Sequence, residues 1–249
     1  MVLVAEIQDI EEKHRGKTLN ESQRHLLSSK LGLWPWVPNE IKQPWEEKIL
    51  CFLELFSFAE TRDEFPTDDI KLLVAAEACL LISKRDFSDY RFLRSIHVWE
   101  NQIPRQPGAQ GMASMREVHL SWKYLEKTIG NGSDGQNLVL HEFAHVIDFS
   151  DDGKAQSIPV PRTSKDYEFW EDLVSDMHQK IVSAHKSGVE FPVRSYAGLQ
   201  CDKGLTPEIF SCGTSAFFER SESLKKECPE FYKALSGFYG MDPAGWIRT

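Results

Sequence analysis

The sequence predicts a single α+β domain that is rich in helices and carries a small antiparallel sheet. Several segments have apolar residues at helical spacing, whereas only residues 94–100 and 116–122 have the apolar and alternating character of strands. Both strands fall between the second and third expected helices of the domain, and no regular alternation of strands with helices indicates a parallel sheet. The 249 residues, 41% of them hydrophobic, are enough to bury one large core.

The expected elements follow from local signals along the chain. Residues 1–40 are mixed and polar and end in an aromatic stretch, so we expect an N-terminal extension packed on a domain formed by residues 41–249. Proline, threonine and asparagine signals mark helix starts. Helices are predicted from Pro44, over 70–82, over 136–149, over 165–186, from Thr206-Pro207 and from Pro229. Residues 101–115 and 187–205 are expected to be loops.

Charge and cysteine usage exclude several classes of protein. The 38 acidic residues outnumber 29 basic ones, and the net charge of −9 argues against direct binding of nucleic acid. No stretch is long and apolar enough for a membrane span, and the first residues lack the pattern of a secretory signal. The five cysteines form no CxxC pair, which favours free thiols. We therefore expect a soluble, cytoplasmic protein that binds no membrane.

One motif predicts catalytic chemistry. His141-Glu142-Phe143-Ala144-His145 is an HExxH sequence inside the expected 136–149 helix. Residues four apart lie on one helix face, so both imidazoles can reach a single Zn²⁺. Glu142 is rotated away from this pair and can act as the catalytic base on a water molecule that the metal acidifies. The alternative is an ordinary core helix with satisfied histidines.

The third metal ligand stays open on spacing alone. Asp148 shares the face of the two histidines, but a rigid helix seldom gives three ligands to one tetrahedral ion, so we favour a role in orienting a histidine ring. A solvated aspartate at the helix end would explain it equally well. Glu168, Glu171 and Asp172 lie on the 165–186 helix, where a solvated first turn would equally explain them. Glu208 follows Pro207 and could be a ligand or simply an acid favoured at a helix start.

Several segments resemble the Mlc titration factor A (MtfA) family of zinc-dependent peptidases. The HExxH segment with its continuation to Asp148 carries the most specific likeness. The other matching segments are residues 118–122, 195–197, 206–210, 215–218 and 231–243, so the resemblance covers about residues 45–245.

The resemblance implies a compact zincin-like fold similar to the catalytic domain of anthrax lethal factor. It also implies one zinc per chain held by His141, His145 and Glu208, with Glu142 as the base. Tyr196 matches a tyrosine that the family places near the metal, where its phenol could stabilise an oxyanion. Ala216 departs from the family, which has a glutamate there, and residues 198–204 look like an insertion.

Two functions follow from these observations. The first is a zinc metallopeptidase, aminopeptidase-like as the family implies, that hydrolyses peptides; residues 116–122 could form an edge strand that pairs with an extended substrate. The second is a non-enzymatic or weakly active regulator that binds and sequesters a transcriptional repressor such as Mlc, which the family association and Ala216 motivate.

Overall fold

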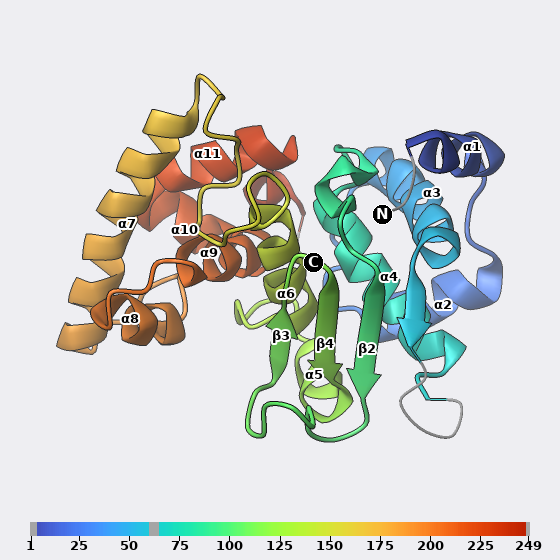
Figure 1. Ribbon diagram of the computed structural model, residues 1–249, viewed down its shortest axis with the longest axis horizontal. Coiled ribbons are helices and arrows are strands. Elements are labelled where there is room, and N and C mark those ends of the chain that lie inside the picture. The colour runs from blue at the N-terminus through green and yellow to red at the C-terminus, as the bar shows by residue number, and fades with distance from the viewer. Residues whose placement is uncertain (1–3, 60–64, 248–249) are drawn as a thin grey trace.

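The computed structural model describes residues 4–59 and 65–247 (Figure 1). Residues 1–3 of the expected N-terminal extension and residues 248–249 of the expected domain therefore lie outside the described residues. The helices are α1 (Val4–His14), α2 (Glu21–Lys30), α3 (Asn39–Leu55), α4 (Asp68–Leu81), α5 (Trp122–Thr128), α6 (Leu138–Asp148), α7 (Tyr167–Ser187), α8 (Ser195–Asp202), α9 (Glu208–Glu219), α10 (Ser221–Glu227) and α11 (Pro229–Tyr239). The strands are β1 (Ser57–Ala59), β2 (Ser95–Trp99), β3 (Gly111–Ala113) and β4 (Glu117–Ser121).

The sheet is mixed, so the prediction of an antiparallel sheet is wrong. Its order is β1-β2-β4-β3, with β1, β2 and β4 parallel and only β3 antiparallel to β4. Parallel neighbours need a long crossover between them. Helix α4 lies between β1 and β2 in the chain, and residues 100–116, which include β3, connect β2 to β4. The two longer strands were predicted at the right residues, but no local pattern in the sequence indicated that they pair in parallel.

The two faces of the sheet differ in character. Ile96, Val98, Val118 and Leu120 point into the core, where α4 and α6 lie behind the strands (Figure 1). The opposite face carries the alternate residues of β2 and β4, which are polar or aromatic. This alternation matches a sheet that is covered by helices on one side only.

The N-terminal region packs closely on the helices that follow it. Trp34 is buried, and its ring centroid lies 4.7 Å from that of Trp45 in α3. Helix α3 begins at Asn39 rather than at Pro44 as predicted. Pro44 removes one helix hydrogen bond, and burial of apolar side chains on both sides of it outweighs that loss.

A helix that the sequence did not predict lies in residues 187–205, which were expected to form a loop. Helix α8 is short and has little amphipathic character, which explains why the apolar pattern missed it. It packs against α7, and a Cβ at Gly198 would collide with the His185 side chain, so glycine allows the close approach. In Figure 1, α7, α8 and α9 lie on one side of α6 and the sheet lies on the other.

Candidate active site

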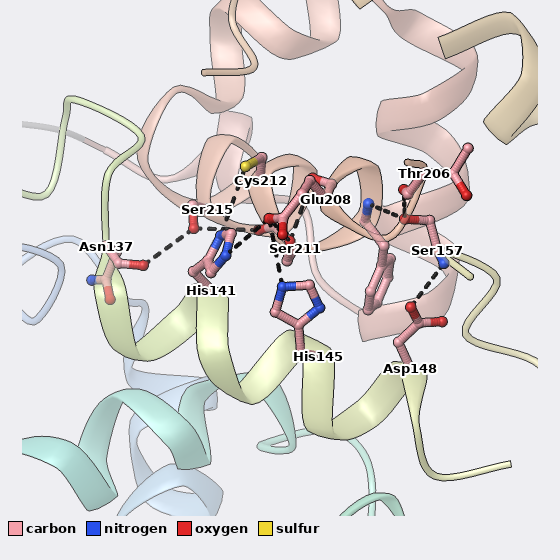
Figure 2. A network of polar contacts seen from close by, with 11 residues as sticks. Asn137, His141, His145, Asp148, Ser157, Thr206, Glu208, Ser211, Cys212 and Ser215 are labelled. Atoms are coloured by element: carbon pink, nitrogen blue, oxygen red, sulfur yellow. Dashed lines mark hydrogen bonds and ion pairs between the residues drawn. The ribbon is translucent and has the colours of Figure 1, made fainter. Parts of the chain in front are cut away.

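Helix α6 carries the HExxH motif and is buried over its whole length. Asn137 caps it, because its side-chain oxygen accepts a hydrogen bond from the Leu140 N–H at 3.0 Å. His141 and His145 lie one turn apart on the face that meets α9 (Figure 2). The predicted helix over 136–149 agrees with the structure within two residues at each end.

Helix α9 brings Glu208 to the two histidines. Glu208 Oε2 lies 3.2 Å from His141 Nε2 and 3.6 Å from His145 Nε2 (Figure 2). The three side chains offer ligand atoms that all lie within 4.8 Å of one another. Donors about 2.0–2.1 Å from one tetrahedral ion are separated by roughly 3.3 Å, so this geometry fits a single zinc. The acids of α7 that were the alternatives, Glu168, Glu171 and Asp172, are exposed instead.

Two of the three side chains are already in the charge state that binds a metal. Burial lowers the pKa of His141 to about 4, which keeps its imidazole neutral. Burial opposes ionisation of Glu208, but hydrogen bonds to His141 and His145 outweigh it and hold the pKa of this carboxyl below its usual range. Burial lowers the pKa of His145, but the hydrogen bond to Glu208 and the nearby carboxylates outweigh it and raise this pKa above its usual value. Neutral imidazoles and an ionised carboxylate are the forms that bind a metal, so metal binding would release the proton of His145.

Glu142 lies beside this group and faces the sheet. Burial raises its pKa to about 7, and the neighbouring Glu208 charge adds to the rise while His145 and Arg194 oppose it. Gly111 of β3 lies against the Glu142 carboxylate, which would overlap a Cβ at this position. The edge strand next to Glu142 is therefore β3. The prediction that residues 116–122 form an edge is wrong, because β4 lies between β2 and β3.

Asp148 contacts backbone groups rather than a histidine ring. Its Oδ2 accepts the Ser157 N–H at 2.7 Å, and its Oδ1 accepts the Ile158 N–H at 3.1 Å. Ser157 Oγ in turn donates to the Thr206 carbonyl at 2.6 Å and accepts the Phe210 N–H at 2.9 Å (Figure 2). Asp148 and Ser157 thus connect the end of α6 to the start of α9, where Glu208 lies. Within the described residues, no hydrogen bond joins Asp148 to either histidine.

Tyr196 extends from α8 toward the same site. Its side chain is 39% exposed, and its ring centroid lies 6.4 Å from that of His141 in an edge-on arrangement. Ala216, which departs from the family pattern, is fully buried on α9. Cys212, also on α9, lies 3.7 Å from His141 Nδ1 through its sulfur.

A buried acidic pair that the sequence did not reveal lies behind the HExxH helix. The Asn137 amide donates to Glu77 Oε1 at 2.5 Å and to Glu219 Oε1 at 3.1 Å. Burial raises the pKa of Glu77 to about 8 and raises that of Glu219 as well. The available signal was Glu77 itself, which interrupts the apolar part of α4, because an acid in a buried helix needs a partner.

A second group with the same residue types lies on the open face of the sheet. His97 of β2 and Glu117 and His119 of β4 offer ligand atoms within 4.8 Å of one another. The rings of His97 and His119 are stacked, with centroids 4.4 Å apart. Residue spacing does not reveal this group, because only the pairing of β2 with β4 brings its members together.

Comparison with known proteins agrees with this geometry. A family model described as glucose-regulated metallo-peptidase M90 matches residues 7–240. An uncharacterized protein of Synechocystis is 24% identical over 88% of this chain and 83% of its own length. Mlc titration factor A of Pectobacterium atrosepticum and of Serratia proteamaculans are 24% and 28% identical, each over 53% of this chain. The chain spans about half the length of these two relatives, 48% of each. No helix among the described residues has the length and apolar character needed to cross a membrane.

Proposed function

This chain belongs to the glucose-regulated metallopeptidase family M90, and we propose that it is a zinc-dependent, aminopeptidase-like enzyme of the gluzincin type, with an HExxH motif and a more distant glutamate. His141, His145 and Glu208 would hold the metal, and Glu142 would be the catalytic base. The observation that carries the proposal is the convergence of three ligand atoms from α6 and α9, with a buried carboxylate beside them. We also propose a zincin-like fold similar to the catalytic domain of anthrax lethal factor, in keeping with the HExxH helix and the edge strand beside it.

Each residue has a distinct part in the proposed hydrolysis. When bound, Zn²⁺ acidifies water and polarises a carbonyl. Glu142 takes the proton from the attacking water and returns it to the leaving amine, and a pKa of about 7 suits both steps near neutral pH. The Tyr196 phenol donates a hydrogen bond to the oxyanion that forms on the substrate.

The peptide would lie between β3 and α8. Strand β3 pairs with β4 on one side only, so its outer edge can bind an extended backbone by strand addition. Gly111 of β3 lies directly against the Glu142 carboxylate. The lack of a side chain there supports a backbone passing near the base. We place the enzyme in the cytoplasm, because all five cysteines are free and buried.

The test combines metal content with hydrolysis of amino-acid anilides. We expect about one zinc per chain in wild type, as a mononuclear site requires, and loss of metal and activity in His145→Ala and Glu208→Ala. Glu142→Gln should keep its zinc and lose activity. Wild type without zinc would contradict the proposal, and so would a Glu208→Ala variant that keeps both metal and activity.

A second function is favoured by the names of the relatives. Proteins called Mlc titration factor A match half of this chain, so we also consider a protein that binds and sequesters a transcriptional repressor such as Mlc. Binding of purified repressor to wild type and to Glu142→Gln separates the two functions. Equal binding, with no peptide hydrolysis in wild type, would favour the regulator.

A further inference from the structure

A cavity of about 430 Å³ adjoins the proposed metal site on the side of α8. It lies between the turn before α6, the end of α7 and the start of α8. Its charged or titratable lining residues are Asp134, His185, Glu190, Arg194 and Arg220. Tyr196 also lines it and packs its ring against His141, so the cavity and the metal site share this tyrosine as a wall.

We propose that this cavity binds a carboxylate of the peptide substrate through Arg194. The inference rests on the proposed peptidase function and adds a substrate class to it: peptides with an acidic side chain or a free C-terminal carboxylate close to the scissile bond. Both sources present the same chemical group, and the test below distinguishes them.

Of the two arginines that line the cavity, Arg194 is the one without an acidic partner among the described residues. Arg220 forms an ion pair with Glu190 at 2.6 Å and donates to the Phe191 carbonyl at 3.0 Å. Asp134 accepts hydrogen bonds from Asn131 and Gln136, both at 2.8 Å. Among the described residues, by contrast, no acidic group pairs with the Arg194 guanidinium.

The position of Arg194 suits a substrate that reaches from the metal site. Its guanidinium carbon lies 5.7 Å from the centroid of the Tyr196 ring, and that ring lies 6.4 Å from the ring of His141. A peptide advances by about 3.3–3.6 Å per residue, so a carboxylate one or two residues from the scissile bond can span this separation.

Guanidinium chemistry and the walls of the cavity both favour a carboxylate. Arginine binds a carboxylate with two parallel hydrogen bonds, and a half-buried pair is screened less by salt than an exposed one. Ile181 and Val193 are buried beneath the cavity and provide an apolar surface for the methylene groups of an acidic side chain.

The experiment compares matched peptides on the zinc-loaded enzyme. Matched peptides with a free N-terminus carry Glu or Gln at the residue before the scissile bond or at one of the two residues after it, and a second set has a free or an amidated C-terminus. We expect wild type to favour one carboxylate position by roughly tenfold or more in kcat/KM, as for a hydrogen bond to a charged group. Preference for Glu over Gln identifies the side chain as the source, and preference for the free end identifies the C-terminus.

Substitutions at Arg194 test the assignment. Arg194→Gln should bring the ratio of kcat/KM for the acidic peptide to that for its neutral counterpart close to one, mainly through a higher KM for the acidic peptide, since uniform binding affects KM alone. Arg194→Lys should keep part of the preference, because it retains the charge but not the planar fork. Arg162→Gln, an exposed arginine outside this cavity, is the matched control and should behave as wild type. Equal thermal midpoints would show that the variants are folded.

Binding gives a second measurement that needs no turnover. Calorimetry with zinc-loaded Glu142→Gln should show that the preferred acidic peptide binds more weakly when Arg194→Gln is added, whereas its Gln counterpart does not. Hydrolysis with equal rates for Glu and Gln peptides and for free and amidated ends would overturn the subsite and leave the peptidase intact. A wild type that neither binds zinc nor cleaves any peptide would overturn both.

Discussion

The chain contains two groups of two histidines and one glutamate, and they differ in what the ring nitrogens contact. In the helical group, His141 Nε2 and His145 Nε2 both face the same Glu208 oxygen, at 3.2 and 3.6 Å. In the sheet group, the ring nitrogens of His97 and His119 are engaged by neighbouring side chains.

The hydrogen bond from Trp99 fixes the tautomer of His119 in the sheet group. The indole N–H can only donate, and it lies 3.2 Å from His119 Nδ1, so Nδ1 carries no proton and Nε2 carries it in the neutral ring. Nε2 lies 3.4 Å from Glu117 Oε2, to which it donates. A metal at His119 Nε2 would have to displace this proton onto Nδ1 and break the Trp99 bond. His97 Nε2 is already within 2.9 Å of Ser95 Oγ.

The same residue types at the same separation therefore do not by themselves make a metal site. The helical group has ligand nitrogens that face a shared point, and surrounding hydrogen bonds hold its two helices in place. The sheet group has the same residue types, but its histidine rings are stacked and their nitrogens already form hydrogen bonds with neighbouring side chains. We therefore expect zinc at the helical group alone.

The largest effect is expected at the base. Glu142→Gln should lower kcat by about 10²–10⁴-fold, because the amide cannot accept the proton, while zinc content stays that of wild type. Glu171→Gln, the same change on the exposed face of α7, is the control and should leave kcat unchanged. Steady-state hydrolysis and metal analysis of the same samples measure both. An active Glu142→Gln enzyme would show that another group is the base.

Stability should depend on pH through Glu77, which lies behind the helical group. Its folded pKa of about 8 exceeds its unfolded value near 4.5, so the folded state holds the proton longer and stability falls as pH rises between these values. Glu77→Gln removes this titrating group. Relative to wild type, the free energy of unfolding of the variant should rise by up to about 1.4 kcal/mol for each pH unit between these two pKa values. Urea unfolding from pH 5 to 8.5 measures the gain, and curves that stay parallel would contradict it.

The connection from α6 to α9 should influence metal affinity. Ser157→Ala removes the hydroxyl that contacts Thr206 and Phe210, so Glu208 is held less firmly and zinc affinity should fall about 10–100-fold, as for other residues that support ligands. Ser157 has a φ of 63°, so Ser157→Gly removes the hydroxyl without steric strain and should show the same loss. Competition with a chelating dye measures affinity, and Ser183→Ala on α7 is the exposed control. Wild-type affinity in both variants would show that the connection does not hold Glu208.

The smallest effect concerns the sheet group. Trp99→Phe frees His119 Nδ1 and should strengthen the weak binding of zinc there by roughly fivefold, the equivalent of one hydrogen bond. The measurement uses a His145→Ala background, so that the helical group does not compete, with Trp122→Phe as the control. Tight zinc binding by the His145→Ala variant that still has Trp99 would show that the tautomer of His119 does not prevent metal binding.

The parts of this account that the sequence could predict are the local ones. The HExxH helix follows from residue spacing, and the Thr67 cap of α4 from one side chain that accepts the Ile70 N–H. Glu208 could not be chosen over the acids of α7 from spacing, because only the packing of α9 on α6 brings it to the histidines.

Other features depend on tertiary contacts that leave little trace in the sequence. The parallel pairing of β2 with β4 depends on the course of a long connection. Helix α8, which places Arg194 and Tyr196 beside the site, is too short and too weakly amphipathic to show a pattern. The hydrogen-bond partners of Asp148 could not be predicted, because the backbone N–H groups of residues 157 and 158 belong to a loop whose path the sequence does not indicate.

The most direct test of the central claim is the zinc content of three purified proteins: wild type, His145→Ala and the double variant His97→Ala/His119→Ala. The account predicts about one zinc per chain in wild type and in the double variant, and none in His145→Ala, as for a single three-ligand site. A double variant that loses its zinc while His145→Ala keeps it would place the metal on the sheet and contradict the account.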